Sequence, residues 1–263
     1  MSKFTPLLHA AVLALMTGCA TTRGTPPGAR AQVSEAAVNE ARSHHSQGVN
    51  FLKEGHIAPA IRELRTAAGL NPNDKWIRLA LGEAYRLRGM GPEALSEVNA
   101  ALALDPDFQE ARLTLSGLYI QLERYSDAIA EAQKLIDDPT YEQVWMPLTN
   151  KGFAQLQLGL LSDAQQALEL ATEFNPRYWR AHLNLGILAV QQGNREEALA
   201  RFEKVIELGA GTAGEDEANY RIAEVYVSLG DRDNALRHLV AATERNPDGQ
   251  WGKRSEDYLK RLQ

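Results

Sequence analysis

The chain has 263 residues, of which 44% are hydrophobic and 24% charged, as in ordinary globular proteins. Its formal net charge is −6, and no block of like charge stands out. Because phosphate contacts dominate the affinity for nucleic acids, this charge pattern argues against a nucleic-acid partner. The length allows one large domain, two smaller domains or an array of repeats.

The first 18 residues have the order of a secretory signal peptide. Lys3 precedes a mostly apolar stretch at residues 4–16, and the small residues Thr17 and Gly18 follow. An apolar stretch of about a dozen residues is too short to cross a bilayer, which takes about 20 residues as a helix. We therefore expect residues 1–18 to be an export signal.

The chain contains a single cysteine, Cys19, directly after this leader. The run Met-Thr-Gly-Cys at residues 16–19 resembles the lipobox of bacterial lipoproteins, where cleavage leaves the cysteine first and lipid-modified. A lone cysteine has no disulfide partner within the chain, so we expect Cys19 to be a lipid anchor rather than a structural or redox thiol. Each acyl chain contributes about 0.8 kcal/mol per buried methylene, so two or three chains anchor a protein almost permanently.

Ala20, rather than aspartate, follows this cysteine. By the sorting pattern of such lipoproteins, the alanine implies the outer membrane, with the protein facing the periplasm. Prolines and glycines then recur over residues 24–28, where they break both helix and strand. We expect residues 19–38 to comprise the lipidated cysteine and a flexible linker.

From residue 39 onward the sequence repeats itself with a period of about 34. Alanine marks one position of each unit: Ala60, Ala94, Ala128, Ala164, Ala198 and Ala235. Twelve residues before each alanine stands a small residue: Gly48, Gly82, Ser116, Gly152, Gly186 and Ala223. Five residues before each alanine stands a glycine, with Glu123 as the exception: Gly55, Gly89, Gly159, Gly193 and Gly230.

Each recurring position has a physical reason. The small residues let two antiparallel helices approach closely, and the glycine ends the first helix because it adopts a left-handed conformation cheaply. This pattern resembles the tetratricopeptide (TPR) repeat. It predicts an all-α fold, an α-solenoid of six helix-turn-helix repeats over residues 39–249. Residues 250–263 are amphipathic and are predicted to form a helix that caps the last repeat.

The units depart from the TPR pattern at one position. The tryptophan that is usual near the start of each repeat is absent here. Other residues take its place: His44, Arg78, Arg112, Leu148, His182 and Asn219.

Two motifs suggest a dinucleotide site and a metal site, but the residues around them do not fit either. Residues 209–214 spell G-x-G-x-x-G, yet a dinucleotide site needs a preceding strand, and residues 201–208 are predicted to be helical. Three acidic residues at 215–217 would also repel phosphate, so we interpret the motif as a loop between repeats five and six. His44 and His45 are neighbours, which point about 100° apart on a helix and rarely share a metal. We expect no catalytic residues, metal, cofactor or small-molecule substrate.

The first helices of stacked repeats share one surface, which is the usual binding surface of such proteins. In TPR proteins the second, fifth, ninth, twelfth and thirteenth residues of each unit line it. These positions predict an apolar partner-binding strip: Val49, Leu52, Trp76, Leu79, Leu113, Ile120, Met146, Phe153, Leu156, Leu183, Ile187 and Val190. Each of these residues could instead fill a seam between helices. An apolar strip of this extent is typical of a binding site, and an amphipathic peptide or helix fits along it.

A lipidated N-terminus, a short linker and six TPR units resemble the pilotins of type IV pilus systems, the Tgl/PilF/PilW group. Those proteins carry a similar Asp-Pro-x-Tyr loop and Asn-x-Gly start, here at residues 138–141 and 150–152. The resemblance implies a non-enzymatic factor that binds secretin (PilQ-like) subunits and promotes their assembly into outer-membrane rings. Two alternatives stay open: a TPR lipoprotein adaptor in β-barrel assembly or cell-wall enzyme recruitment, and an enzyme whose active site straddles repeats.

Overall fold

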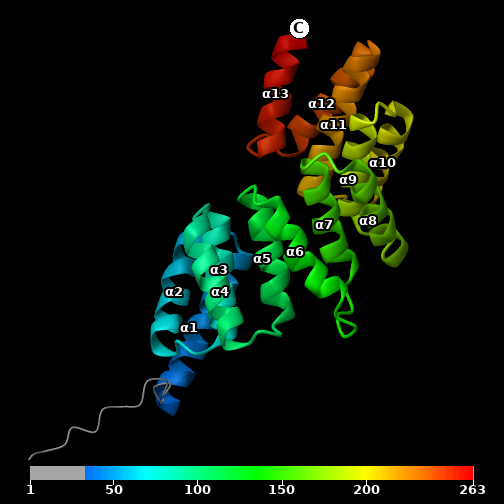
Figure 1. The fold of residues 1–263 in the computed structure, drawn as a ribbon. Helices are drawn as coiled ribbons and strands as arrows, with labels where there is room; N and C mark the ends of the chain where they lie inside the picture. The colour runs from blue at the N-terminus through cyan, green and yellow to red at the C-terminus, as the bar shows by residue number, and fades with distance from the viewer. Residues whose placement is uncertain (1–32, 263) are drawn as a thin grey trace, which may run out of the picture. The chain divides into compact units, whose positions relative to one another are not determined.

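The computed structural model describes residues 33–262 (Figure 1). The predicted signal peptide, Cys19 and the linker up to residue 32 lie outside these residues. The described part contains 13 α-helices and no strand. Twelve of the helices form six consecutive pairs: α1 (Glu35–Lys53) with α2 (Ile57–Leu70), α3 (Lys75–Arg88) with α4 (Gly91–Leu104), α5 (Gln109–Gln121) with α6 (Tyr125–Ile136), α7 (Trp145–Gln157) with α8 (Leu161–Phe174), α9 (Trp179–Gln191) with α10 (Arg195–Leu208), and α11 (Ala213–Leu229) with α12 (Arg232–Arg245).

The thirteenth helix, α13 (Gln250–Leu262), packs on both α11 and α12. The ring of Trp251 lies 5.2 Å from that of Tyr220 on α11, and the ring of Tyr258 lies 6.0 Å from it. The prediction of an all-α solenoid of six repeats with a capping helix is confirmed. α1 begins at Glu35, upstream of residue 39, because Ser34 accepts a hydrogen bond from the backbone N–H of Ala37 and caps the helix there.

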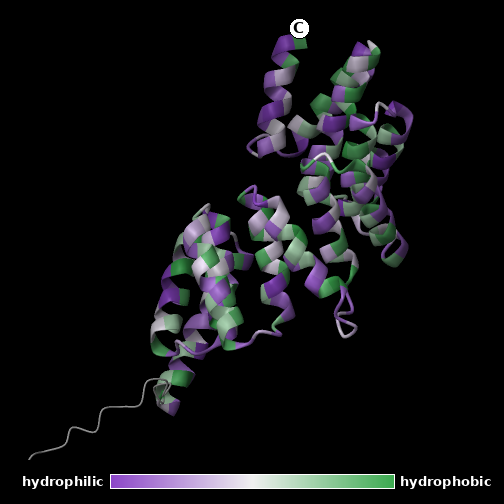
Figure 2. Ribbon diagram, in the orientation of Figure 1, coloured by the Kyte–Doolittle hydropathy of each residue, from purple (hydrophilic) through white to green (hydrophobic). Residues whose placement is uncertain are grey.

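Successive pairs of helices pack in series. Each odd-numbered helix packs against the next odd-numbered helix, from α1 on α3 through to α11 on α13. No two even-numbered helices of residues 33–262 bring their Cα atoms within 8 Å. The odd-numbered helices therefore share one surface of the stack, which we call the first-helix face. Figure 2 shows hydrophobic residues distributed along all the helix pairs, as expected for a core divided among repeats.

The small residues of each first helix mark the closest approach within a pair. A β-carbon added to Gly48 would lie 2.5 Å from the side chain of Leu64, and one on Gly82 would lie 2.7 Å from Val98. In the third repeat the hydroxyl of Ser116 donates instead to the backbone carbonyl of Ala128, at 3.1 Å. All six registered alanines are fully buried at these seams.

The turns inside the repeats use the predicted glycines. Gly55, Gly89, Gly159, Gly193 and Gly230 have φ between 75° and 79°, the left-handed region in which glycine carries no steric penalty. In the third repeat Glu123 adopts the same conformation, with φ 58°. It is the one non-glycine residue with positive φ in the described part of the chain. The geometry of the turn is therefore imposed by the repeat, and Glu123 carries the steric cost.

Four of the six positions where tryptophan is usual hold polar bridges between paired helices. Arg78 donates to Glu97 at 2.7 Å and Arg112 donates to Glu131 at 2.9 Å, each pair 19 residues apart. The same spacing joins His44 to Glu63, at 2.6 Å, and Asn219 to His238, at 2.9 Å. A polar contact thus ties the two helices together in these four repeats, and it is charge-assisted where a glutamate takes part.

Candidate partner-binding surface

All twelve predicted partner-binding residues lie on odd-numbered helices, two or three on each helix from α1 to α9. The structure separates them by burial. Leu79, Leu156 and Leu183 are at most 9% exposed and belong to core clusters between helices. These three side chains fill seams and offer no area to a partner, so the candidate surface contains the other nine.

Two of the nine are largely exposed, Trp76 at 48% and Val190 at 46%. The ring of Trp76 packs edge-on to Phe108 at 4.6 Å, and the ammonium of Lys75 lies 4.5 Å from the Phe108 ring. The remaining seven are half-buried: Val49, Leu52, Leu113, Ile120, Met146, Phe153 and Ile187. Half-buried apolar residues on one face leave edges that a partner can cover.

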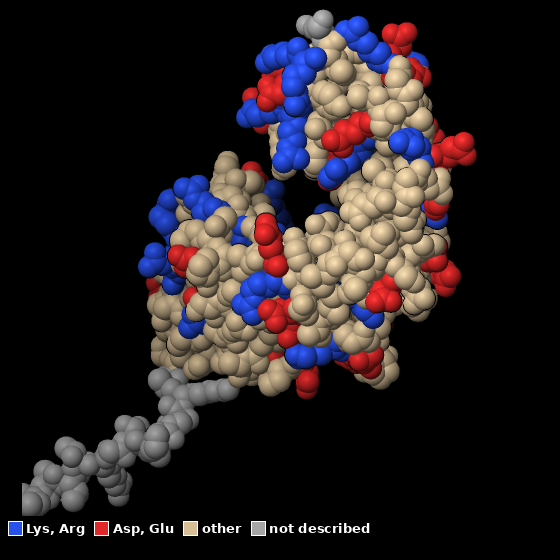
Figure 3. Space-filling view, turned by 45° about the horizontal axis from the view of Figure 1, so that its top comes forward, with Lys and Arg blue, Asp and Glu red and all other residues tan. Residues whose placement is uncertain are grey.

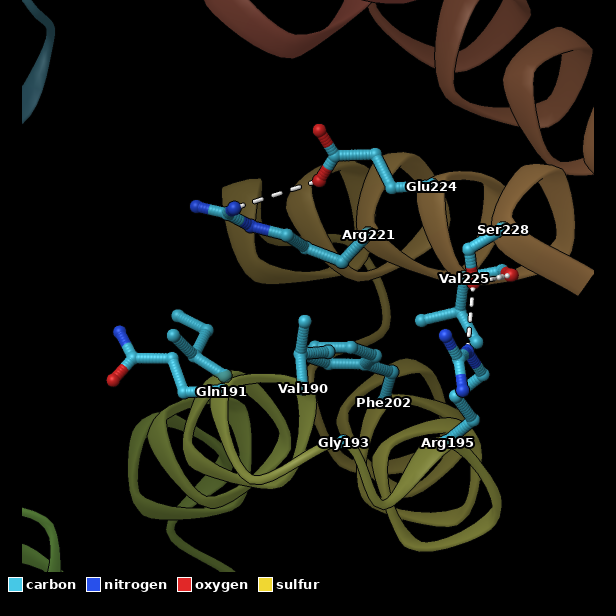
Figure 4. Close-up of a pocket in the computed structure, with 10 residues that line it drawn as sticks. Val190, Gln191, Gly193, Arg195, Phe202, Arg221, Glu224, Val225 and Ser228 are labelled. Atoms are coloured by element: carbon cyan, nitrogen blue, oxygen red, sulfur yellow. Dashed lines mark hydrogen bonds and ion pairs between the residues drawn. The ribbon is translucent and has the colours of Figure 1, made fainter.

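A cavity of about 420 Å³ opens on this face between α9, α10 and α11 (Figure 4). Ile187 and Val190 line it, as does Gln191, and all three stand at positions that the TPR register assigns to the binding surface. Phe202, which is fully buried, forms part of its apolar wall together with Val225 of α11. The cavity therefore lies between the fifth and sixth repeats.

Polar groups line the edge of the same cavity. The guanidinium of Arg221 lies between two carboxylates, 3.2 Å from Glu217 and 3.5 Å from Glu224. Burial raises the pKa of Glu217 above its ordinary value, and the charge of Arg221 offsets this only in part. Arg195, at the start of α10, donates from Nε to the hydroxyl of Ser228 at 3.0 Å. None of the residues 33–262 places a carboxylate within ion-pair distance of Arg195.

A second hollow, of about 360 Å³, lies where the loop between α6 and α7 meets α5, and Leu113 lines it. The side-chain amide of Gln109 holds the loop by donating to Asp138 and Thr140, at 2.7 and 2.9 Å. Hydrogen bonds from Thr140 and then Gln109 lower the pKa of Asp138. Burial, followed by the charge of Glu110, raises the pKa of Tyr141 to about 12. The Asp-Pro-Thr-Tyr loop is therefore a fixed, polar border of the first-helix face.

Four of the six backbone N–H groups of residues 209–214, the glycine-rich segment before α11, donate within the protein. α10 precedes it, as predicted, and the backbone N–H of Gly211 donates to the carboxylate of Glu215 at 2.8 Å. Thr212 caps α11 by accepting from the N–H of Gly214, and Trp179 packs against that glycine. A carboxylate of the protein thus accepts from one of the N–H groups that the motif would offer to a phosphate.

The neighbouring histidines point to different surroundings. His44 contacts Glu63, whereas burial lowers the pKa of His45. No group of three or more His, Cys, Asp or Glu side chains within residues 33–262 is arranged to hold a metal ion.

Charges of both signs lie among wide uncharged areas on the face drawn in Figure 3. The exposed apolar residues, such as Trp76 and Val190, thus lie on a surface that also carries charges of both signs.

Two family models described as tetratricopeptide repeat match the chain. One covers residues 88–146 and 189–253, and the other covers residues 45–107 and 150–213. Together they span most of the described helices. The chain belongs to the tetratricopeptide repeat family. None of the helices of this TPR protein within residues 33–262 has the length and apolar character that crossing a membrane requires.

Three curated proteins illustrate its relatives. Type IV pilus assembly protein PilF of Pseudomonas aeruginosa is 23% identical over 85% of this TPR protein and 86% of PilF. Outer membrane protein assembly factor BamD of Caulobacter vibrioides is 22% identical over 79% of this chain and 66% of its own length. Human protein O-mannosyl-transferase TMTC1 is 25% identical over 61% of this chain, but the match spans only 18% of TMTC1.

Two solved structures share the fold. The crystal structure of the type IV pilus biogenesis factor PilW superposes with a TM-score of 0.68 at 18% identity, covering 81% of this chain and 96% of PilW. The structure of P. aeruginosa PilF superposes with a TM-score of 0.64 at 17% identity, covering 85% of this chain and all of PilF. At these identities the likeness shows the fold alone.

Several residues of this surface could not be predicted from the repeat pattern. Phe202 and Arg221 line the cavity, but Phe202 belongs to a second helix and Arg221 lies outside the five surface positions of its repeat. Gly186 gives a partial signal for Phe202, because a glycine opposite an aromatic ring indicates close packing. Arg195 is the first residue of α10, and no periodicity marks it.

Proposed function

We propose that this TPR protein is a non-enzymatic, outer-membrane lipoprotein adaptor of the pilotin type. It binds secretin subunits on its first-helix face and promotes their assembly into the outer-membrane ring of a type IV pilus system. The observation that carries the proposal is the likeness to PilF, which extends over most of both chains, whereas the likeness to TMTC1 covers one segment of a much longer protein.

The physical arrangement supports this function. A lipid on Cys19 would hold the repeats at the membrane surface and raise the effective concentration of captured subunits there. The nine accessible apolar residues, from Val49 to Val190, would cover apolar segments of a subunit before it joins the ring. Binding through several repeats distributes the contact, so the affinity would depend on a few anchor residues rather than on total area.

A second function is favoured by the relation to BamD. BamD is described as an outer membrane protein assembly factor, and the match covers 79% of this chain. In this alternative the same first-helix face receives another protein of the β-barrel assembly pathway. The anchor, the face and the absence of a catalytic role are common to both functions, so partner identity alone separates them.

The test is the state of the secretin in cells. We expect cells lacking this gene to keep secretin monomer but lose the heat- and detergent-resistant multimers from their outer membranes. Restoring the wild-type gene should recover the multimers, and a Cys19→Ala variant expressed at equal abundance should recover few of them. Unchanged multimers in the deletion strain would contradict the pilotin function and leave the barrel-assembly function to be tested by crosslinking.

A further inference from the structure

The cavity between the fifth and sixth repeats combines an apolar interior with positive charge at its edge. Figure 4 shows Val190 and Phe202 on one side and α11, with Arg221, Glu224 and Ser228, on the other. The apolar walls cannot hydrogen-bond to the water that enters, so an apolar side chain is the better occupant. The volume of about 420 Å³ accommodates one bulky aliphatic or aromatic side chain together with part of its backbone.

The charges of the cavity are unequal. Both carboxylates, Glu217 and Glu224, pair with Arg221, whereas Arg195 contacts only the neutral hydroxyl of Ser228, so the positive charge of Arg195 is the one without a local counter-charge. In addition, the Nε–H of Arg221 is shielded from solvent and donates to no acceptor among residues 33–262. The edge of the cavity therefore offers, at Arg195, a guanidinium that no carboxylate neutralises locally, and a carboxylate is the group that complements it.

We propose that this cavity docks a protein segment in which a bulky apolar side chain is accompanied by an Asp or Glu. The apolar side chain enters between α9 and α11, and the carboxylate pairs with Arg195. The two ligand residues lie within about one helical turn of each other, since Arg195 borders the same cavity. The inference rests on the proposed function only in that the first-helix face binds a protein.

The occupant is a protein segment rather than a free small molecule because of where the cavity lies. Ile187, Val190 and Gln191 stand at register positions that recur along the whole first-helix face, and Val190 is 46% exposed beside the opening. A chain that follows the face can place one side chain here and continue over the half-buried apolar residues of the preceding repeats.

The experiment uses the full-length protein in lipid nanodiscs and an oriented library of 12-residue synthetic peptides. Each peptide carries a central leucine, and the flanking residues vary among Ala, Ser, Asp, Glu, Lys and Arg. We expect the wild type to enrich Asp and Glu near the leucine about tenfold over Lys and Arg. An Arg195→Glu variant should reverse this preference, and Val190→Asp should weaken binding of all leucine peptides at least tenfold.

Arg65→Glu is the matched control, because Arg65 is an exposed arginine on α2 with no ion-pair partner in the described chain. It should leave both the selection and the melting temperature unchanged. No enrichment by the wild type, enrichment of basic residues, or an Arg195→Glu variant that selects as the wild type does would each overturn the proposal. Binding of palmitate that depends on Arg195, without peptide selection, would identify a fatty acid as the occupant and also overturn it.

Secretin multimers in cells that express Arg195→Glu distinguish this inference from the proposed function. Loss of the multimers supports both. Normal multimers, combined with charge-dependent peptide selection in vitro, support the docking site and show that the secretin does not use it.

Discussion

Glu123 occupies a turn in which every other repeat has glycine, so Glu123→Gly should stabilise the protein. With φ 58° it lies in the left-handed region, which costs a non-glycine residue about 1–2 kcal/mol. Glycine removes this cost but loses about 0.5–1 kcal/mol through the greater freedom of the unfolded chain. The carboxylate of Glu123 is exposed and forms no ion pair or hydrogen bond in the described structure, so nothing else is lost. The net expected gain is about 0.5–1 kcal/mol.

Thermal unfolding followed by circular dichroism measures this gain, which corresponds to a rise of about 1–4 °C for a domain of this size. Repeat arrays open locally, so amide hydrogen exchange in α5 and α6 should slow more than exchange in α1 or α12. Glu123→Ala is the matched control, because it removes the carboxylate and keeps the left-handed residue. If Glu123→Ala stabilised the protein as much as Glu123→Gly, the carboxylate rather than the backbone conformation would be the source of the cost.

Three further substitutions test the packing and the buried histidine. Ala128→Leu should overpack the fully buried seam of the third repeat and lower the unfolding free energy by about 1–3 kcal/mol; an unchanged urea midpoint would contradict the seam assignment. Gly186→Ala should also lower the unfolding free energy by about 1–3 kcal/mol, because the new methyl group would overlap the buried ring of Phe202. Unchanged stability would show that the ring can shift. Burial lowers the pKa of His182 below 6.5, and its Nδ1 has no hydrogen-bond partner among the described residues. The neutral side chain therefore contributes stability that is present above pH 6.5 and is lost as the pH falls below that value. His182→Leu, which copies Leu148 of the fourth repeat, should therefore show a shallower loss of stability between pH 7 and 5, and parallel pH profiles would refute this.

The fold was predictable because its determinants are local and repeated. Small residues, glycines and alanines recur at fixed spacing, and each position has the same role in each repeat. Even the exception is informative, since Glu123 adopts the conformation of the glycine it replaces. The polar bridges, such as that between Arg78 and Glu97, were not predicted, because they depend on two positions in different helices.

The candidate surface was predictable only in part. The register placed all twelve residues on first helices, but it could not separate Leu183, which is buried, from Val190, which is exposed. That distinction depends on the side chains of neighbouring helices and on how closely adjacent repeats approach. The cavity depends further on Phe202 and Arg195, whose positions follow from the tertiary structure and from no periodic pattern.

The contacts between helices also make the stack mechanically asymmetric. Bending it can widen or narrow the spaces between even-numbered helices without breaking any backbone contact, since they make none with one another. The odd-numbered helices keep their contacts during such a bend, so their continuous row acts as a hinge line. The cavity between α9 and α11 lies on this line. A side chain bound there would restrict the movement of the fifth and sixth repeats relative to each other. Binding at this point would therefore depend on how far a pulling force bends the stack.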